Sequence, residues 1–461
     1  MLDLVSLPRT EVVVNAHESK GPLEWWRHSL GQGGINSLPL PPRVRAGVAR
    51  LRPRLIRVFI QEHFDLYPDH GRFDWRKLDR FMDALAETGA KVVAAITIKP
   101  PALFRKVDHG IWEPADVAEW QHVIHQLVRR YSVEKPVVTH WEVGNETDIG
   151  EDGGAPYLIP DARDYARFYD ITTRPILAAC SSAKVGGPAS CWVENEPLPG
   201  FVSACRARGA RLDFISWHLY HDDAGRHAAG VGIAQRLLSD FPPPRPEMMV
   251  TEWNKSFDPV SAEDLAFVPR RAASVAAAVI AMLDAGLDWS FYYHIWDQVF
   301  YPDPFRPFFS AKGVRNMEVH WNEAPHRFGL FGVEGEVRPQ YFVYQMLGRL
   351  GDERAAADSD HPSVRVLAGR AERSAAALIA NYQPQERRDT VVTVRFAGLR
   401  PGPRLLTVHR IDSARRWSPE DLELIPIERR EVYASEEFRC SLYVPADTVA
   451  MVRLEDGAGV E

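Results

Sequence analysis

The sequence predicts a (β/α)8 TIM barrel followed by a C-terminal antiparallel β-sandwich domain. Two observations carry this prediction. From about residue 28 to 350, short apolar runs alternate with amphipathic segments of helical periodicity. After about residue 355, short apolar or alternating runs follow one another, separated by Gly, Pro and Asp turns. Continuous apolar runs suit parallel strands that are covered on both faces, and short strands with frequent turns are typical of a sandwich.

Eight segments match the expected strands of the barrel. Most are short, continuous apolar runs, and amphipathic helical segments lie between them, as in other (β/α)8 domains. In chain order they are HSLGQGG (28–34), RLIRVFI (54–60), KVVAAITI (91–98), PVVTHWEVGN (136–145), AKVGGPA (183–189), LDFISWHLY (212–220), EMMVTEW (247–253) and DWSFYYHIW (288–296).

Amphipathic segments between these strands supply the helices. The segment DWRKLDRFMDALAETGA (74–90) places its Trp, Leu, Phe and Met residues at helical spacing. The segment DVAEWQHVIHQLVRRY begins with Asp116 and Glu119 at the separation of a capping box. An alanine-rich helix, RRAASVAAAVIAMLDAG, ends at Gly286, and PQYFVYQMLGRLG (339–351) forms the last helix before the change of pattern.

A doubly wound open sheet is the alternative fold. It would more often carry a Gly-rich phosphate turn after an early strand, and GQGG (31–34) lacks the GxGxxG spacing of that turn. We therefore expect three parts. Residues 1–20 contain a strand, TEVVVNA, that joins the sandwich; residues 21–352 form the catalytic barrel; and residues 353–461 form the sandwich.

The bulk composition argues against several classes of function. The 461 residues carry a net charge of −7 and no long Lys/Arg run, so nucleic acid and anionic membranes are not expected partners. No apolar stretch reaches the roughly 18 residues of a membrane span, and the first residues lack the pattern of a signal peptide, so we expect a cytoplasmic protein. The four cysteines show no CxxC spacing, which predicts free thiols. No motif predicts a cofactor.

Two of the predicted strands end in a glutamate beside turn-like polar residues. HWEVGNE ends at Glu146, MMVTEWN contains Glu252, and these are strands four and seven in order. Reactive groups of a barrel gather at the C-terminal ends of its strands, so the two carboxyl groups would face each other across the mouth. Such a pair can cleave a glycosidic bond, because a protonated carboxyl assists the leaving oxygen while an ionised one attacks or activates water. One strand-end glutamate alone would be read as a cap or a surface acid; two on these strands favour a functional pair.

The motifs around both glutamates resemble those of clan A retaining glycoside hydrolases, and most of all glycoside hydrolase family 39, the family of β-xylosidases and α-L-iduronidases. WEVGNE is similar to that family's strand-four motif, KVGGPAS to strand five, DFISWHLY to strand six and VTEWNKS to its nucleophile strand. FGLFGVEGEVRPQYFVYQMLGRLG resembles the helix that leads into the family's accessory domain, and the matches run in order over roughly residues 20 to 355. Gly144 and Thr147 depart from the family's usual Trp before and Pro after Asn-Glu, and Gly-Asn-Glu is closer to the arabinofuranosidase relatives in the clan.

This resemblance implies a role for each residue of the motifs. Glu146 would be the general acid and base, Glu252 the nucleophile, and Asn145 a hydrogen-bond partner of the sugar hydroxyl next to the anomeric carbon. Retention implies carboxyl groups about 5–5.5 Å apart rather than about 6.5–9.5 Å. The implied activity is that of a β-xylosidase-like exo-glycosidase acting on an oligosaccharide or glycoside. Because the family often assembles, a homo-oligomer is a further expectation.

Strand geometry adds an expectation that does not depend on the family. Glu142 and Glu146 are four residues apart on one strand, so they share a face, and Glu142 would lie one layer deeper in the barrel. A buried carboxylate needs a partner. The candidate is Arg57 on strand two, which would reach Glu142 or lie under Glu252 and keep that carboxyl ionised. The alternative is that Arg57 points outward to solvent.

Other polar and aromatic residues near the strand ends are candidate substrate ligands, with packing as the alternative for each. The resemblance places His218 and Tyr220 beside the nucleophile. Trp296 would form an aromatic floor under the sugar ring, and Asn254 and Asp297 would bind hydroxyl groups. The segment 301–329 is long and aromatic with little secondary-structure signal, so we expect a loop that shapes the pocket.

Other functions stay open at this stage. The chain could be an exopolysaccharide- or arabinoside-acting glycosidase of the same clan, or a silent carbohydrate-binding protein on the same fold. A metal-dependent hydrolase would draw on the cluster His218, His221, Asp222, Asp223 and His227, but this cluster lacks the HExxH spacing, and we expect no metal. A uronate-specific site would need cations, which Lys255 and Arg327 could supply.

Overall fold

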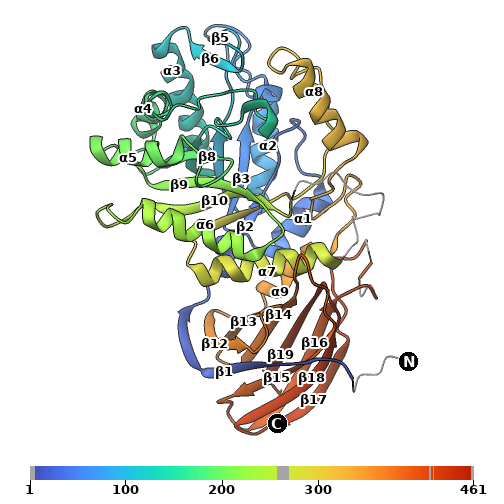
Figure 1. The fold of residues 1–461 in the computed structure, drawn as a ribbon. Coiled ribbons are helices and arrows are strands. Elements are labelled where there is room, and N and C mark those ends of the chain that lie inside the picture. The colour runs from blue at the N-terminus through green and yellow to red at the C-terminus, as the bar shows by residue number, and fades with distance from the viewer. Residues whose placement is uncertain (1–5, 257–268, 415–416, 419, 458–461) are drawn as a thin grey trace.

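The computed structural model describes residues 6–256, 269–414, 417–418 and 420–457, and it places a barrel on top of a second, sheet-based domain (Figure 1). Eight parallel strands close the barrel in the order β10-β11-β2-β3-β4-β7-β8-β9, which confirms the predicted (β/α)8 architecture. The strands are β2 (His28–Gly31), β3 (Leu55–Ile60), β4 (Lys91–Ile96), β7 (Val138–Val143), β8 (Lys184–Ser190), β9 (Phe214–Tyr220), β10 (Glu247–Asn254) and β11 (Trp289–Tyr293).

Helices surround the barrel and bury their apolar faces against it. Asp116 accepts hydrogen bonds from the backbone N–H groups of Ala118 (2.8 Å) and Glu119 (3.2 Å), so it caps α3 as expected. Glu119 does not complete a capping box, because its side chain instead accepts from Tyr67 and His70. The helices are α1 (Pro42–Leu51), α2 (Arg76–Ala86), α3 (Val117–Val128), α4 (Ala162–Ala179), α5 (Leu198–Arg208), α6 (Ala224–Leu237), α7 (Pro269–Ala285), α8 (Ala311–Glu318) and α9 (Pro339–Leu347).

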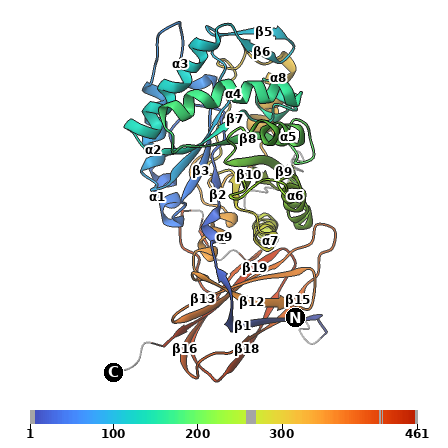
Figure 2. The same ribbon diagram turned by 90° about the vertical axis from the view of Figure 1, so that its left-hand side faces the viewer.

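The second domain is a nine-stranded sheet with the order β17-β16-β19-β14-β13-β12-β1-β15-β18. Its strands are antiparallel neighbours except that β1 pairs in parallel with β15. The sheet bends so that apolar side chains from its two halves share one core, as in a sandwich (Figure 2). The strands are β1 (Arg9–Pro22), β12 (Glu353–Ser359), β13 (Val364–Ala371), β14 (Ser374–Asn381), β15 (Thr390–Ala397), β16 (Gly402–Ile411), β17 (Glu428–Ala434), β18 (Glu437–Val444) and β19 (Thr448–Asp456).

Helix α7 joins the two domains. It lies between the barrel and strands β13, β14 and β19, and every residue from Arg271 to Met282 is buried. Small side chains let the helix pack closely on both sides, which explains its alanine-rich sequence. Beside it, the Arg270 guanidinium donates to the carbonyl of Pro384 (2.8 Å) and pairs with Asp447 (3.3 Å).

Two elements at the top of the barrel differ from the prediction. A short hairpin, β5 (Phe104–Asp108) and β6 (Ile111–Pro114), is inserted between β4 and α3. The segment 301–329, expected to be a loop, contains α8 and a π-helical turn, Val319–Glu323. The helix is short, and Ser310 caps it by accepting from the N–H of Gly313 (3.1 Å). Its Gly and Asn residues weaken the helical signal in the sequence.

Among the described residues, no helix is both long enough and apolar enough to cross a membrane.

Candidate active site

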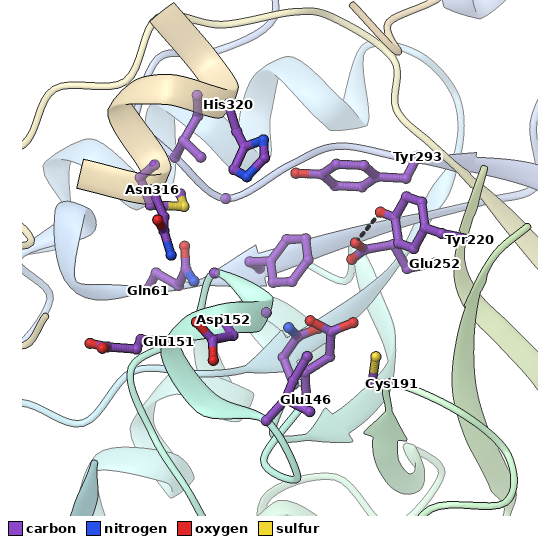
Figure 3. A pocket seen from close by; sticks show the side chains of 18 of the residues that line it. Gln61, Glu146, Glu151, Asp152, Cys191, Tyr220, Glu252, Tyr293, Asn316 and His320 are labelled. Carbon is purple, nitrogen blue, oxygen red and sulfur yellow. Dashed lines mark hydrogen bonds between the residues drawn. The ribbon is translucent and has the colours of Figure 1, made fainter. Parts of the chain in front are cut away.

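A cavity of about 320 Å³ lies at the C-terminal ends of the barrel strands (Figure 3). Residues of β3, β9, β10 and β11, of the segments that follow β2, β3, β7 and β8, and of α8 with its π-helical turn surround it. The lining residues are Gly34, Ile35, Phe59, Gln61, Asn145, Glu146, Ile149, Glu151, Asp152, Gly153, Gly154, Cys191, Trp192, Tyr220, Glu252, Tyr293, Asn316, Met317, His320 and Trp321.

Glu146 reaches the cavity from a turn that follows β7. The strand ends at Val143, and the chain then adopts left-handed backbone at Gly144 (φ +91°) and at Glu146 (φ +45°). Glycine takes this conformation without steric cost, whereas a glutamate there must be held by its surroundings. Three backbone hydrogen bonds hold it: the Glu146 N–H donates to the carbonyl of Ala189 (2.9 Å), and its own carbonyl accepts from the N–H groups of Ile149 (3.1 Å) and Gly150 (2.9 Å).

Glu252 reaches the cavity from within β10. The register of β10 against β9 shifts between Val250 and Glu252, and Glu252 lies opposite His218. Such a register shift changes the direction in which a side chain points, and shifts of this kind are common beside active sites. The next residue, Trp253, points the other way and packs against Tyr292 with ring centroids 5.4 Å apart. Trp253 therefore belongs to the core, as the alternation along the strand requires.

The two carboxyl groups and one imidazole converge at the bottom of the cavity. One oxygen of Glu146, one of Glu252 and one ring nitrogen of His218 all lie within 4.8 Å of one another. Glu146 is only 4% exposed and Glu252 only 7%. The two predicted strand-end glutamates thus lie in one compartment, close enough for both to contact the same bond of a substrate.

Arg57 connects the two strand ends from below. Its Nε donates to Glu142 (2.8 Å), one Nη to Glu252 (2.9 Å) and the other Nη to the side-chain oxygen of Asn145 (2.6 Å). Arg57 is 1% exposed, and Glu142 is completely buried. The structure therefore shows both contacts that the sequence suggested for Arg57, with Glu142 one layer beneath the cavity. The planar, forked guanidinium makes this three-way contact possible.

The surroundings of the two cavity carboxyl groups differ. Burial raises the pKa of Glu146 well above its usual value, and the nearby charge of Glu252 raises it further. Burial also raises the pKa of Glu252, but the Arg57 guanidinium and the Tyr220 hydroxyl, which donates to Glu252, oppose that rise. Because these two donors contact Glu252 and not Glu146, the proton that the pair shares resides on Glu146.

His218 completes the contacts of Glu146. Its Nδ1 lies 2.7 Å from one oxygen of Glu146, and the ring is completely buried. Burial lowers the pKa of His218 well below its usual value, so the imidazole is neutral. A neutral ring at hydrogen-bond distance orients the Glu146 carboxyl without holding it permanently ionised.

Besides His218, which is completely buried against Glu146, three predicted ligands do not line the cavity. Strand β11 ends at Tyr293, three residues before Trp296, so Tyr293 is the aromatic residue at this strand end and Trp296 donates its indole N–H to the carbonyl of Val333 (3.1 Å). Asn254 donates to the carbonyl of Tyr293 and accepts from the N–H of Lys255 (2.7 Å). Asp297 pairs with Arg338 at 2.6 Å, away from the cavity.

Several lining residues were not singled out from the sequence. Gln61 continues the face of β3 that carries Arg57, and strand parity could have identified it. The loop after β7 brings Glu151, Asp152 and Gly153, whose positions no sequence periodicity predicts. Trp321 lies on the π-helical turn after α8, inside the segment that was expected to shape the pocket.

The cavity also contains a group of donors that could hold a cation. It consists of the side chains of Glu146, His218 and Glu252. A cation here would have to displace the contact between His218 and Glu146, and would lie near the charge of Arg57. The loop cluster considered from the sequence is engaged elsewhere: Asp222 pairs with Lys255 (3.3 Å), and the His227 ring contacts the carbonyl of His221 (3.2 Å).

Comparison with known proteins places the chain in a family. The model of Glycosyl hydrolases family 39 matches residues 55–440. A β-xylosidase of Caldicellulosiruptor saccharolyticus is 25% identical over 340 residues, which are 67% of this chain and 64% of that relative, less than two thirds of its length.

Solved structures share the fold over the whole chain. The family 39 enzyme from Xanthomonas axonopodis pv. citri has a TM-score of 0.75 and 18% identity, with 98% of each chain covered. A monomeric β-xylosidase from Caulobacter crescentus has a TM-score of 0.73 and 21% identity, with 97% of this chain and 100% of that chain covered. At these identities the likeness shows the fold alone.

Proposed function

The chain belongs to glycosyl hydrolase family 39, and on that premise we propose that it is a retaining glycosidase that removes a neutral sugar, as a β-xylosidase does. The observation that carries the proposal is the pair Glu146 and Glu252, within 4.8 Å of each other in unlike surroundings. This spacing fits the roughly 5–5.5 Å of retaining enzymes and leaves no room for the water that an inverting enzyme places between its carboxyl groups.

The first step follows from the protonation of the pair. The ionised Glu252 carboxylate attacks the anomeric carbon, and Glu146 gives its proton to the leaving oxygen, so the glycosidic bond breaks as a glycosyl ester forms. Arg57 stabilises the charge of Glu252 before the attack. When Glu252 loses its negative charge on forming the ester, the Arg57 guanidinium stays paired with Glu142.

The second step reverses the roles. Glu146, now ionised, takes a proton from water, and the resulting hydroxide attacks the anomeric carbon and releases Glu252. The negative charge of Glu252 is one cause of the raised pKa of Glu146. This pKa therefore falls once Glu252 has formed the neutral ester. The same carboxyl can therefore serve as acid and then as base.

The lining of the cavity supports a neutral sugar. No Lys or Arg is among the described residues that line it, and Lys255 and Arg327, the cations considered for a uronate, are not lining residues. A uronate carboxylate would lie unpaired beside Glu146 and Glu252. Aromatic side chains suit the apolar face of a sugar ring; they are Phe59, Trp192, Tyr220, Tyr293 and Trp321. The small cavity favours removal of a terminal sugar over cleavage within a long chain.

A panel of nitrophenyl β-xyloside, α-arabinoside, β-glucoside, β-galactoside and α-iduronide tests the proposal, with NMR of the first-formed anomer. We expect the xyloside to be cleaved best, with the β-anomer appearing first. Glu146→Gln and Glu252→Gln should each lower kcat at least about 100-fold with the fold intact by circular dichroism.

Glu323→Gln is the matched control, since this exposed glutamate pairs with Arg315 outside the cavity. Its activity should equal that of the wild type. Cleavage of none of the five glycosides, with sugar binding retained, would identify a silent carbohydrate-binding protein instead. The cytoplasmic location and self-association expected from the sequence stay predictions.

A further inference from the structure

We propose that residues 150–154, here called the bridging loop, position the acid–base carboxyl of Glu146 and tie it to helix α8, with Gly153 and Glu151 as the positioning residues. This inference rests on the proposed function. The bridging loop follows β7 and consists of a 3-10 turn, Gly150–Gly153, and Gly154. It lines the cavity between Glu146 and α8 (Figure 3).

Gly153 forms the wall against which the Glu146 side chain lies. A Cβ atom on Gly153 would lie 2.0 Å from one carboxylate oxygen of Glu146 and 2.9 Å from its Cβ. No side chain fits there unless the whole Glu146 side chain moves. The backbone φ of Gly153 is not in the left-handed region, so a substitution acts through this contact and not through backbone strain.

Glu151 fastens the other side of the bridging loop to the start of α8. One of its carboxylate oxygens accepts from the N–H of Ser310 (2.9 Å) and the other from the Ser310 hydroxyl (2.6 Å). Ser310 in turn caps α8. A carboxylate at a helix N-terminus is favourably placed, and hydrogen bonds to a charged group are stronger than neutral ones.

Helix α8 supplies part of the cavity wall that faces the bridging loop. Asn316 and Met317 line the cavity, and a Cβ on Gly154 would lie 3.8 Å from the Met317 sulfur. The loop after the fourth barrel strand and the helix after the eighth are therefore joined by the two hydrogen bonds between Glu151 and Ser310. A displacement of α8 would be transmitted through Glu151 and Gly153 to the carboxyl that gives up the proton.

The chemistry of the leaving group separates this role from a merely structural one. A misplaced acid slows the departure of a poor leaving group, which needs the proton, and has little effect on a good one, which does not. Measurements therefore compare kcat/KM for xylobiose with that for 2,4-dinitrophenyl β-xyloside, together with the pH dependence of each.

Gly153→Ala should lower kcat/KM for xylobiose by about tenfold or more and move the alkaline limb of its pH profile, while kcat/KM for the dinitrophenyl glycoside changes less than about twofold. Glu151→Gln and Ser310→Ala should give a smaller effect with the same selectivity. Lys312→Ala is the matched control. Its exposed pair with Asp152 (3.3 Å) is another link between α8 and the bridging loop, and surface pairs contribute little.

Equal losses on both substrates, or no loss with Gly153→Ala, would overturn the positioning role while the wild type remains active. If Gly153→Ala does not fold, Glu151→Gln and Ser310→Ala decide the outcome by the same substrate ratio. A wild-type protein that cleaves neither substrate would instead refute the proposed function, so the two failures are distinguishable.

Discussion

At the scale of single residues, the guanidinium of Arg57 gives the two cavity carboxyl groups different environments. It donates to Glu252 and not to Glu146, and its remaining donors are taken by Glu142 and Asn145. The charge of Glu142 balances Arg57 from beneath, so the guanidinium does not fully neutralise Glu252. This arrangement keeps one carboxyl ionised while burial keeps the proton on the other.

Replacing Arg57 tests this account. Arg57→Met should raise the pKa of Glu252, because burial then acts without an opposing charge, and the acid limb of the kcat/KM profile should move to higher pH. Leaving Glu142 unpaired should also lower the free energy of unfolding by about 3–5 kcal/mol in denaturant titrations. Arg54→Met, an exposed site just before the same strand, is the control and should leave the pH profile unchanged. An acid limb that stays in place in Arg57→Met would contradict the role.

The raised pKa of Glu146 has a consequence for stability. A carboxyl whose folded pKa lies above its unfolded pKa near 4.5 binds protons more tightly in the folded state, so folding loses stability as pH rises from the unfolded pKa to the folded one. Glu146→Gln removes this loss. Its free energy of unfolding should match that of the wild type near pH 4 and exceed it increasingly above pH 5, as measured by urea titrations across pH. A difference that does not depend on pH would show that Glu146 does not have a raised pKa.

The residues at strand ends divide into those that sequence reasoning can place and those that it cannot. Asn145 and Glu146 stand beside a glycine just after an apolar strand, and Glu252 stands within one, so both strands could be ordered and their carboxyl groups assigned to one mouth. Trp296 was misplaced because the predicted strand ran to residue 296, whereas β11 ends at Tyr293 and the Trp296 indole reaches the carbonyl of Val333 instead of the cavity. The position of Gly153 against Glu146 could not be predicted either, because it depends on the path of a loop, which no sequence periodicity describes.

At the scale of elements, β3 and the residue that follows it present the side chains of the ion pair and of the cavity wall on one face. Arg57, Phe59 and Gln61 alternate toward the mouth, from the ion pair beneath the cavity to its wall. Gln61 is 2% exposed, and its side-chain oxygen has no hydrogen-bond partner among the described residues. If the chain acts as proposed, a sugar hydroxyl would be the donor that this oxygen lacks.

We therefore expect Gln61→Leu to raise KM for the xyloside roughly tenfold, equivalent to one hydrogen bond of about 1.4 kcal/mol. The melting temperature should not fall, because the change removes a buried acceptor without a partner. Gln32→Leu is the contrasting control. Gln32 is equally buried but bonds the backbone of Trp296 at both ends (3.0 and 3.1 Å), so its loss should lower the melting temperature and leave KM unchanged. An unchanged KM in Gln61→Leu would exclude this contact.

Regular elements were predictable to the extent that periodicity marked them. Most of the barrel strands and the helices α3, α7 and α9 carry continuous apolar or amphipathic patterns. The run CSLYVPADTVAMVRLE (440–455) is apolar on both sides of a short polar interruption, and it contributes to two strands, β18 and β19, with the turn at residues 445–447 between them. The hairpin β5–β6 was not predicted, because only one of its residues is buried and its sequence shows no apolar alternation.

At the scale of the whole molecule, the barrel and the sheet domain depend on each other through α7. A helix on the outside of a barrel normally keeps a polar face, but α7 is buried on all sides from Arg271 to Met282. The sheet domain covers the face that the barrel leaves bare. The sheet itself depends on β1, which comes from the start of the chain and lies between β12 and β15. The first strand of the sequence therefore supports the last domain, and that domain supports the barrel.

This dependence predicts that a destabilising substitution in β1 also lowers the stability of the barrel. Val14 is completely buried in the core of the sheet domain, whereas Val13, next to it, points to the other face and is only partly buried. Val14→Asp places an unpaired carboxylate in that core and should lower the free energy of unfolding by at least about 3 kcal/mol, while Val13→Asp should cost much less. Because α7 transmits the loss, the ellipticity of the barrel helices and the glycosidase activity of Val14→Asp should disappear in one transition, at a temperature well below that of Val13→Asp. If the sheet domain of Val14→Asp melts first while activity persists, the barrel folds independently and α7 does not couple the two domains.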